Sequence, residues 1–279
     1  MKKEGNQQEY GNGAFVVEKI EGKQLNTSKN QESGKKTPLM DIKDKSDNHS
    51  INDKVSYKVM LDIDNYKNAH YILKSKPEYM TADSYEIILD SRWKEKIYKI
   101  IEKLKDRSFQ FTPSNIIHIT KDNGKIRAFG VPTYWDKLVL EVFRAALENK
   151  VEKIFNNSSH GFRPGKNSHT ALKRVTSWTG VRWIIQGHFI SFFDSIDLHI
   201  LANLLSFYID SNLLGLYWKM VKAGYIEDST EKKEETLTGI LQGLRPKAYG
   251  LLTPLLSNIY LHELDEYLTR HCLVGLRPR

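Results

Sequence analysis

Apolar residues recur every three or four positions along much of the chain after residue 56, which is the spacing of one face of an α-helix. The clearest case is Trp93–Lys105, where five apolar residues keep this spacing and charged residues fill the positions between them. We predict an amphipathic helix there. The same pattern predicts further helices over residues 69–76, 137–155, 169–178, 198–208, 213–223 and 251–269.

Short apolar runs predict a few strands between these helices. Residues 116–119 and 126–131 flank Asp122-Asn123-Gly124, a combination typical of a tight hairpin turn. Residues 182–186 predict a buried strand, and residues 227–235 predict a charged loop. Because helices dominate and the strands are short and antiparallel, the pattern indicates the α+β class.

The first 56 residues differ from the rest in composition. They are rich in Lys, Asn, Gln, Ser and Gly, and residues 26–50 carry few large apolar side chains. Such a segment cannot bury enough apolar surface to offset the entropy of ordering the chain. We therefore expect residues 1–56 to be a disordered low-complexity segment and residues 57–279 to form the folded domain.

The charge of the chain is concentrated in the folded part. Of 42 Lys and Arg and 34 Asp and Glu, residues 1–56 hold ten Lys and nine acidic residues, which leaves 32 and 25, or +7 of the net +8, for residues 57–279. This balance suits a polyanionic partner such as nucleic acid. The single cysteine, Cys272, excludes an intrachain disulfide. No apolar run approaches the ~18 residues of a membrane-spanning helix, so we expect no membrane partner.

Four strings of residues occur in a distinctive order. Residues 121–133 read KDNGKIRAFGVPT, residues 158–172 read SSHGFRPGKNSHTAL, residues 183–200 read WIIQGHFISFFDSIDLHI, and residues 238–265 read TGILQGLRPKAYGLLTPLLSNIYLHELD. Together they resemble the fingers and palm motifs of group II intron-encoded reverse transcriptases and maturases, over about residues 71–267. The resemblance implies an incomplete right-hand polymerase, with fingers and part of a palm.

The first two strings carry basic residues on predicted turns. In the family the hairpin cations reach nucleotide phosphates and template, which implies such a role for Lys121, Lys125 and Arg127. Lys acts there as a point charge, and Arg offers a fork that matches phosphate. In the second string Arg163 and Lys166 are candidate phosphate contacts.

The same string contains two glycines that suit tight turns close to a ligand, Gly161 and Gly165. Ser168 is placed to cap the helix that follows. A plain structural role, as a tight turn with a surface Arg that leads into a helix, is also partly true of this string in the family.

The third string differs from the family pattern at a position that the family uses for catalysis. The resemblance implies a Mg²⁺-binding Asp at the position of His188. Mg²⁺ prefers oxygen ligands, and a protonated imidazole would repel it. Asp194 and Asp197 match carboxylates that begin the next helix, and we do not assign them to a metal. Phe193 matches the residue that packs under the nucleotide sugar, although a core position explains it equally well.

The fourth string implies a nucleotide contact by Gln242 and Gly243. Residues 244–249 form a six-residue insertion after them, which includes Pro246 and is expected to displace the contact. The 279 residues also contain no Tyr-Ala-Asp-Asp, the family's second metal motif, and no thumb or maturase domain. We therefore expect no intact catalytic or metal site and no cofactor of this chain, whereas the family uses Mg²⁺.

Three functional interpretations remain open. The chain is a maturase-like protein that binds structured intron RNA in splicing, or an active RNA-directed DNA polymerase completed by a separate polypeptide, or a non-functional fragment of an intron-encoded gene. The Asn- and Lys-rich composition fits an AT-rich organelle genome. We expect an organelle-encoded mitochondrial protein, with a plastid or the bacterial cytoplasm as alternatives.

Overall fold

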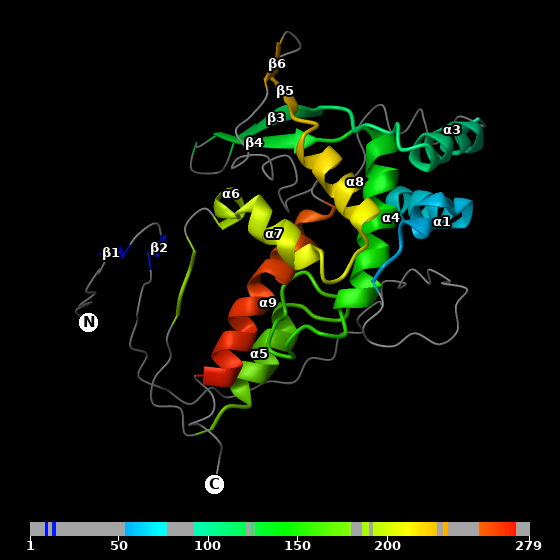
Figure 1. Ribbon diagram of the computed structural model, residues 1–279. Coiled ribbons are helices and arrows are strands. Elements are labelled where there is room, and N and C mark those ends of the chain that lie inside the picture. The colour runs from blue at the N-terminus through cyan, green and yellow to red at the C-terminus, as the bar shows by residue number, and fades with distance from the viewer. Residues whose placement is uncertain are drawn as a thin grey trace.

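The computed structural model describes residues 9–10, 13–14, 54–76, 92–120, 124, 126–179, 186–189, 192–227, 231–233 and 251–271. The helices gather around a central helix, α4, and a small sheet lies at one end of them (Figure 1). In chain order the helices are η1 (Tyr57–Leu61, a 3-10 helix), α1 (Ile63–Lys74), α3 (Trp93–Lys105), α4 (Tyr134–Val151), α5 (Ser168–Thr176), α6 (Phe192–Ser195), α7 (Leu198–Leu205), α8 (Ser211–Val221) and α9 (Thr253–His271). The strands are β1 (Glu9–Tyr10), β2 (Gly13–Ala14), β3 (Ser114–Thr120), β4 (Ile126–Val131), β5 (Tyr225–Glu227) and β6 (Glu231–Lys233).

The core is built around α4. Thirteen of its 18 residues are buried, so it presents apolar side chains on nearly all sides. It contacts η1 and α1 on one side and α9 on the other, while α7 packs on both α8 and α9. Thr133 begins the helix, because its hydroxyl accepts a hydrogen bond from the amide of Asp136.

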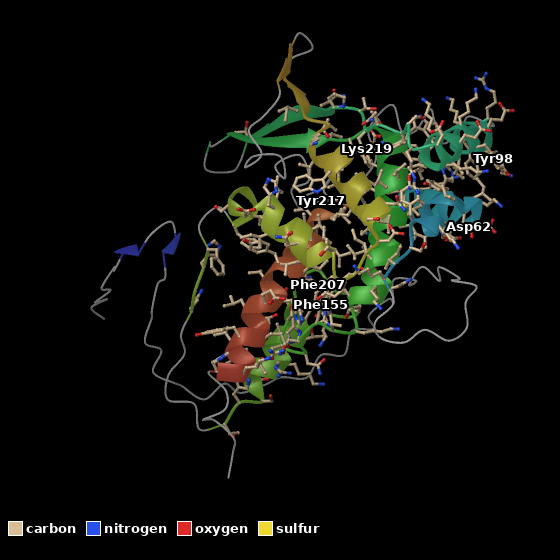
Figure 2. All side chains as sticks on the ribbon, viewed as in Figure 1. Asp62, Tyr98, Phe155, Phe207, Tyr217 and Lys219 are labelled. Carbon is tan, nitrogen blue, oxygen red and sulfur yellow. The ribbon has the colours of Figure 1, made fainter. Side chains whose placement is uncertain are left out.

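Polar side chains tie the outer helices to this core. Tyr217 of α8 is fully buried, and its hydroxyl donates to the carbonyl of Leu198 at 3.2 Å (Figure 2). Lys219 donates to the carbonyl of Phe109 at 2.9 Å, which joins α8 to the segment after α3. Both hydrogen bonds join α8 to residues that are distant along the chain.

The predicted helices are largely confirmed. Trp93–Lys105 forms α3 with the predicted bounds, and α4, α5, α7, α8 and α9 lie on the predicted ranges with shifts at their ends. The largest shift is in α1, which begins six residues before the predicted start at residue 69. The reason is Asp62, whose side chain accepts from the amide of Asp64 and starts the helix earlier.

The sheet contains the predicted hairpin and two strands that were not predicted. β3 and β4 pair antiparallel from Asn115 opposite Val131 to Thr120 opposite Ile126, and Gly124 has a φ of 74° in the turn. β5 pairs parallel to β3, and β6 pairs antiparallel to β5, so the strand order is β4-β3-β5-β6. The prediction of a charged loop over residues 227–235 is therefore wrong at β6 and at the end of β5.

These elements confirm the α+β class. The predicted strand over residues 182–186 lies outside the described residues except for its last position, and Gln186 belongs to no helix or strand. None of the helices placed in the structure is long and apolar enough to cross a membrane.

The packed chain begins slightly before the predicted domain boundary at residue 57. Val55 pairs with Ile209 in a parallel bridge, and its amide donates to the carbonyl of Tyr208 at 2.7 Å. The amide of Tyr57 then donates to the carboxylate of Asp210 at 2.6 Å. The first described residues after β2 are thus tied to the start of α8.

Candidate nucleic-acid interface

The segment between α4 and α5, which we name the 156–167 loop, is organised by one buried side chain. Arg163 is 8% exposed, and its Nη2 contacts the carboxylate of Glu152 at 2.8 Å. Its Nη1 donates to the carbonyls of Asn156 at 2.7 Å and Ser159 at 2.9 Å. The planar guanidinium thus joins the end of α4 to two turns of the loop.

This geometry argues against the predicted phosphate contact of Arg163. Its Nε also donates to Glu152, and the guanidinium lies 5.3 Å from the centre of the Phe155 ring. A phosphate would have to displace a buried ion pair and two carbonyl contacts at once. The arrangement supports the structural interpretation, in which Arg163 holds the turn and other residues of the loop face solvent.

The loop is also fastened to α9 and to α5. The side-chain amide of Asn258 donates to the carbonyl of Gly161 at 2.9 Å. Asn167 caps α5, because its side chain accepts from the amide of Thr170 while the Thr170 hydroxyl accepts from the amide of Asn167. The prediction that Ser168 is the cap is wrong by one position. The neighbouring cation, Lys166, is half-buried, and its Nζ donates to the carbonyl of Asn157 at 3.2 Å.

The predicted cations of the β3–β4 hairpin are only partly described. Arg127 lies in β4 opposite Ile119, which puts it close to the hairpin turn. Its side chain lies outside the described part of the structure, and so do Lys121 and Lys125 altogether. Their roles at phosphates therefore stay predictions. The nucleotide-contact pair Gln242 and Gly243 and the insertion after it also lie outside the described residues.

His188 lies on the exposed segment 186–189, just before a group of aromatic rings. The ring of Phe192 lies 5.9 Å from Phe189, 5.3 Å from Phe193 and 6.4 Å from Tyr260 of α9, measured between ring centres. Phe193 itself is half-buried. The position for which the sequence resemblance implies a metal-binding Asp thus lies beside an apolar cluster and carries an imidazole.

The nearby Asp197 performs the structural role that the sequence predicts for it. Its carboxylate accepts from the amides of His199 at 2.8 Å and Ile200 at 3.0 Å and so caps α7. These backbone hydrogen bonds, led by that from Ile200, lower the pKa of Asp197. The side chain of Asp194 lies outside the described residues. Within the described part of the chain, no three His, Cys, Asp or Glu side chains come together as a metal-binding group.

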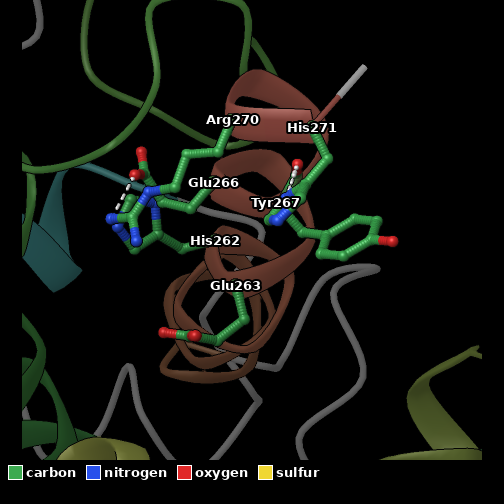
Figure 3. A pocket seen from close by; sticks show the side chains of 6 residues that line it. All are labelled: His262, Glu263, Glu266, Tyr267, Arg270 and His271. Atoms are coloured by element: carbon green, nitrogen blue, oxygen red, sulfur yellow. Dashed lines mark hydrogen bonds and ion pairs between the residues drawn. The ribbon is translucent and has the colours of Figure 1, made fainter.

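A shallow hollow on α9 was not predicted from the sequence. Figure 3 shows the side chains that line it, which are His262, Glu263, Glu266, Tyr267, Arg270 and His271. Arg270 pairs with Glu266 at 3.1 Å, and the His271 ring stacks on Tyr267 at 4.4 Å. Because these charges are mixed and mostly paired with one another, the hollow offers no clear preference for an anion or a cation.

Comparison with known proteins places the chain among group II intron proteins. It is 39% identical over 214 residues to "Group II intron-encoded protein LtrA" of Lactococcus lactis subsp. cremoris, which covers 76% of this chain and 34% of the relative. It is 37% identical over 235 residues to "Uncharacterized 91 kDa protein in cob intron" of Schizosaccharomyces pombe, covering 82% of this chain and 28% of the relative. "Nuclear intron maturase 1, mitochondrial" of Arabidopsis thaliana is 26% identical over 226 residues, with shares of 63% and 31%.

No family model matches the sequence. The similarity to several intron proteins over most of the chain nevertheless defines its class. The chain belongs to the family of group II intron-encoded proteins. It spans about a third of the length of these curated relatives, with shares of 34%, 28% and 31%.

Proposed function

We propose that this protein is a maturase-type RNA-binding protein, which binds structured RNA of a group II intron and assists its splicing without copying it. The observation that carries the proposal is the 39% identity with an intron-encoded protein over 214 residues. The net charge of +8 supports it, because positively charged surfaces bind the RNA backbone largely through charge and shape.

Within this proposal, the described fold is the fingers and part of the palm of a right-hand polymerase. The hairpin β3–β4, the long helix α4 and the 156–167 loop follow one another in the order of the family's motifs. The basic hairpin with Lys121, Lys125 and Arg127 and the loop with Lys166 form the proposed RNA-binding surface. Arg163 holds the loop in place through its ion pair with Glu152.

The absence of copying rests on the chemistry of the donor set. Two-metal phosphoryl transfer needs carboxylates that hold Mg²⁺. His188 offers an imidazole at the family's Asp position, and Asp197 already accepts two backbone hydrogen bonds at the start of α7. These residues do not fit a Mg²⁺ site. For cellular location, we propose a mitochondrial protein encoded in the organelle. The mitochondrial location is supported by the Arabidopsis thaliana relative, whose name gives that location, although another relative is bacterial.

RNA binding is tested by filter binding to a transcribed group II intron over a range of salt concentrations. Lys125→Ala combined with Lys166→Ala should lower the affinity and reduce the salt slope by about 0.7–0.9 for each lost phosphate contact. Lys99→Ala combined with Lys103→Ala removes the same charge from α3 and is the matched control. Equal effects of the two double variants would contradict the placement of the surface.

Splicing and copying are tested separately. Adding the protein should raise the rate of self-splicing of its intron RNA at low Mg²⁺ concentration. Primer extension on an RNA template with deoxynucleotides should give no product, and His188→Asp alone should not restore it, since loss of metal neutralisation costs several powers of ten in rate. Mg²⁺-dependent extension by the unmodified chain would instead favour an active RNA-directed DNA polymerase.

A further inference from the structure

A long stretch of the chain around the 156–167 loop contains no acidic residue. Between Glu152 and Asp194, residues 153–193 hold no Asp or Glu, in a protein with 34 acidic residues among 279. The same stretch holds six cations, which are Lys153, Arg163, Lys166, Lys173, Arg174 and Arg182. Lys173 and Arg174 lie on α5 and are exposed. A segment without carboxylates attracts a polyanion and adds no repulsion of its own.

In the middle of this stretch the structure presents an aromatic ring to solvent. Phe162 is 61% exposed and has a φ of 55°, a left-handed backbone conformation that is rare for a bulky residue. Such strain persists only where the surroundings impose it, and it tends to occur at functional sites.

The surroundings that impose it are visible on both sides of the residue. Before it, the carbonyl of Gly161 accepts from Asn258 of α9 at 2.9 Å. After it, the side chain of Arg163 is buried against Glu152 and the loop carbonyls, and the Arg163 carbonyl accepts from the amide of Lys166 at 3.1 Å. The backbone of Phe162 is thus held between two anchored residues, in the conformation that leaves its ring 61% exposed.

Positive charge also gathers around His160, two positions before Phe162 in the chain. The pKa of His160 is lowered, first by loss of solvation and then by the charges of Lys166, Arg174 and Arg163. The Nδ1 atom of His160 lies 2.8 Å from the hydroxyl of Thr170 in α5. His160 thus joins the loop to α5, the helix that carries the exposed Lys173 and Arg174.

We infer that Phe162 is a stacking platform for an unpaired RNA base, and that Lys166, Lys173 and Arg174 hold the phosphates beside that base. Stacking on an exposed aromatic ring between cations is how proteins bind single-stranded nucleic acid without reading its sequence. This inference rests on the proposed function and assigns unpaired, flexible RNA to a place apart from the hairpin. The stretch 153–193 favours RNA over an apolar protein partner because such a partner would not require a segment free of carboxylates.

The test uses the full chain and an oligoadenylate of about 12 nucleotides, which lies within the usual 4–16 nucleotides of such sites. Phe162→Ala should weaken its binding by about 5- to 160-fold, the usual effect of losing one aromatic–base stack. Phe162→Tyr keeps the stacking and should bind as the unmodified chain does. Asn tolerates a positive φ, so Phe162→Asn removes the ring and keeps the backbone conformation. It should lose affinity as Phe162→Ala does, which would show that the lost ring and not a changed backbone causes the loss. Tyr71→Ala removes another aromatic ring, 70% exposed on α1, and should change nothing.

Two further measurements separate stacking from charge. Phe162→Ala should leave the salt slope unchanged, whereas Lys173→Ala combined with Arg174→Ala should lower it by about 0.7 for each lost contact to a single strand. Heparin, a polyanion without bases, should bind the unmodified chain and Phe162→Ala equally.

Unchanged oligoadenylate affinity in Phe162→Ala, or an equal loss for heparin, would overturn the inference. The inference would also be overturned if the unmodified chain bound a protein at this surface, Phe162→Ala did not, and both bound oligoadenylate equally. If in either case Lys125→Ala still weakens the binding of intron RNA, only this inference fails. If intron RNA does not bind at all, the proposed function fails with it.

Discussion

Helices α4 and α5 show two different ways in which this chain holds a helix in place. Thirteen of the 18 residues of α4 are buried, whereas none of the nine residues of α5 is. Leu172 and Val175 of α5 are 61% and 42% exposed, although both are apolar. α4 is therefore positioned by packing, and α5 is positioned mainly by polar anchors in the loop that precedes it. A helix held in this way can present its side chains to a partner without weakening the core.

The largest expected effect comes from the same substitution made in each helix. Leu138→Ala in α4 removes a fully buried side chain and should lower the free energy of unfolding by about 2–5 kcal/mol. Leu172→Ala in α5 should change it by less than about 0.5 kcal/mol, as for most exposed positions. Urea denaturation followed by circular dichroism measures both. Similar values for the two variants would show that α5 packs against more of the protein than the structure indicates.

Arg163→Ala should come next in size, because it removes the main anchor of the loop. It leaves Glu152 and the carbonyls of Asn156 and Ser159 without their partner, and we expect a loss of about 2–3 kcal/mol because Glu152 is partly exposed. Lys166→Ala is the matched control and should cost less than about 0.5 kcal/mol. Thermal unfolding checks the pair. Loss of RNA affinity with no loss of stability in Arg163→Ala would restore Arg163 as a phosphate contact.

The helix cap should have a smaller and more local effect. Asn167→Ala removes one half of the capping box and should destabilise α5 by about 1 kcal/mol, while Ser168→Ala should have almost no effect. Since α5 buries no residue, we expect this loss to appear as local opening. Amide hydrogen exchange in α5 should become about five-fold faster in Asn167→Ala, with little change in the unfolding midpoint. Faster exchange in Ser168→Ala as well would contradict the assignment of the cap.

The smallest expected effect is a pH dependence on the α1 side of α4. Burial, and then the charge of Lys74, lower the pKa of His70 below its ordinary value of 6.5. The folded state therefore resists protonation that the unfolded state accepts, so stability is full above pH 6.5 and declines as the pH falls toward the lowered pKa. His70→Phe keeps a ring against Trp93, which stacks on His70 at 4.4 Å, and should remove this dependence. An unchanged slope of stability against pH between 5 and 7 in His70→Phe would assign the dependence to other groups.

The sequence predicts those parts of the fold that depend on neighbours along the chain. The spacing in Trp93–Lys105 and the turn signal that ends at Gly124 are local, and helix α3 and the β3–β4 pair form as expected. β6 could not be predicted in this way, because it is joined to the hairpin only through β5, whose partner Ser114 lies more than 100 residues earlier. Long-range strand pairing leaves little trace in a short window of sequence.

The same distinction between local signals and long-range contacts applies to the candidate site. The family resemblance and the replacement at His188 can be read from the residues alone. The position of Arg163 could not, since an Arg in a Gly- and Pro-containing loop has the same pattern whether it faces phosphate or Glu152. The exposure of Phe162 could not be predicted either, because it follows from the backbone conformation and from contacts with α9.

The link between Val55 and the residues that begin α8 has a consequence for how the protein is made. The amide of Tyr57 bonds to Asp210, 153 residues further along the chain. On a ribosome that adds about 5–20 residues per second, the partner of Tyr57 is made about 8–30 s later. During this interval η1 and α1 can pack against α3 and α4. The hydrogen bond to Asp210 that fixes the start of η1 is still missing. Nascent chains that stall before residue 210 should therefore stay sensitive to protease near Val55, and a chaperone that shields this region would act in that interval.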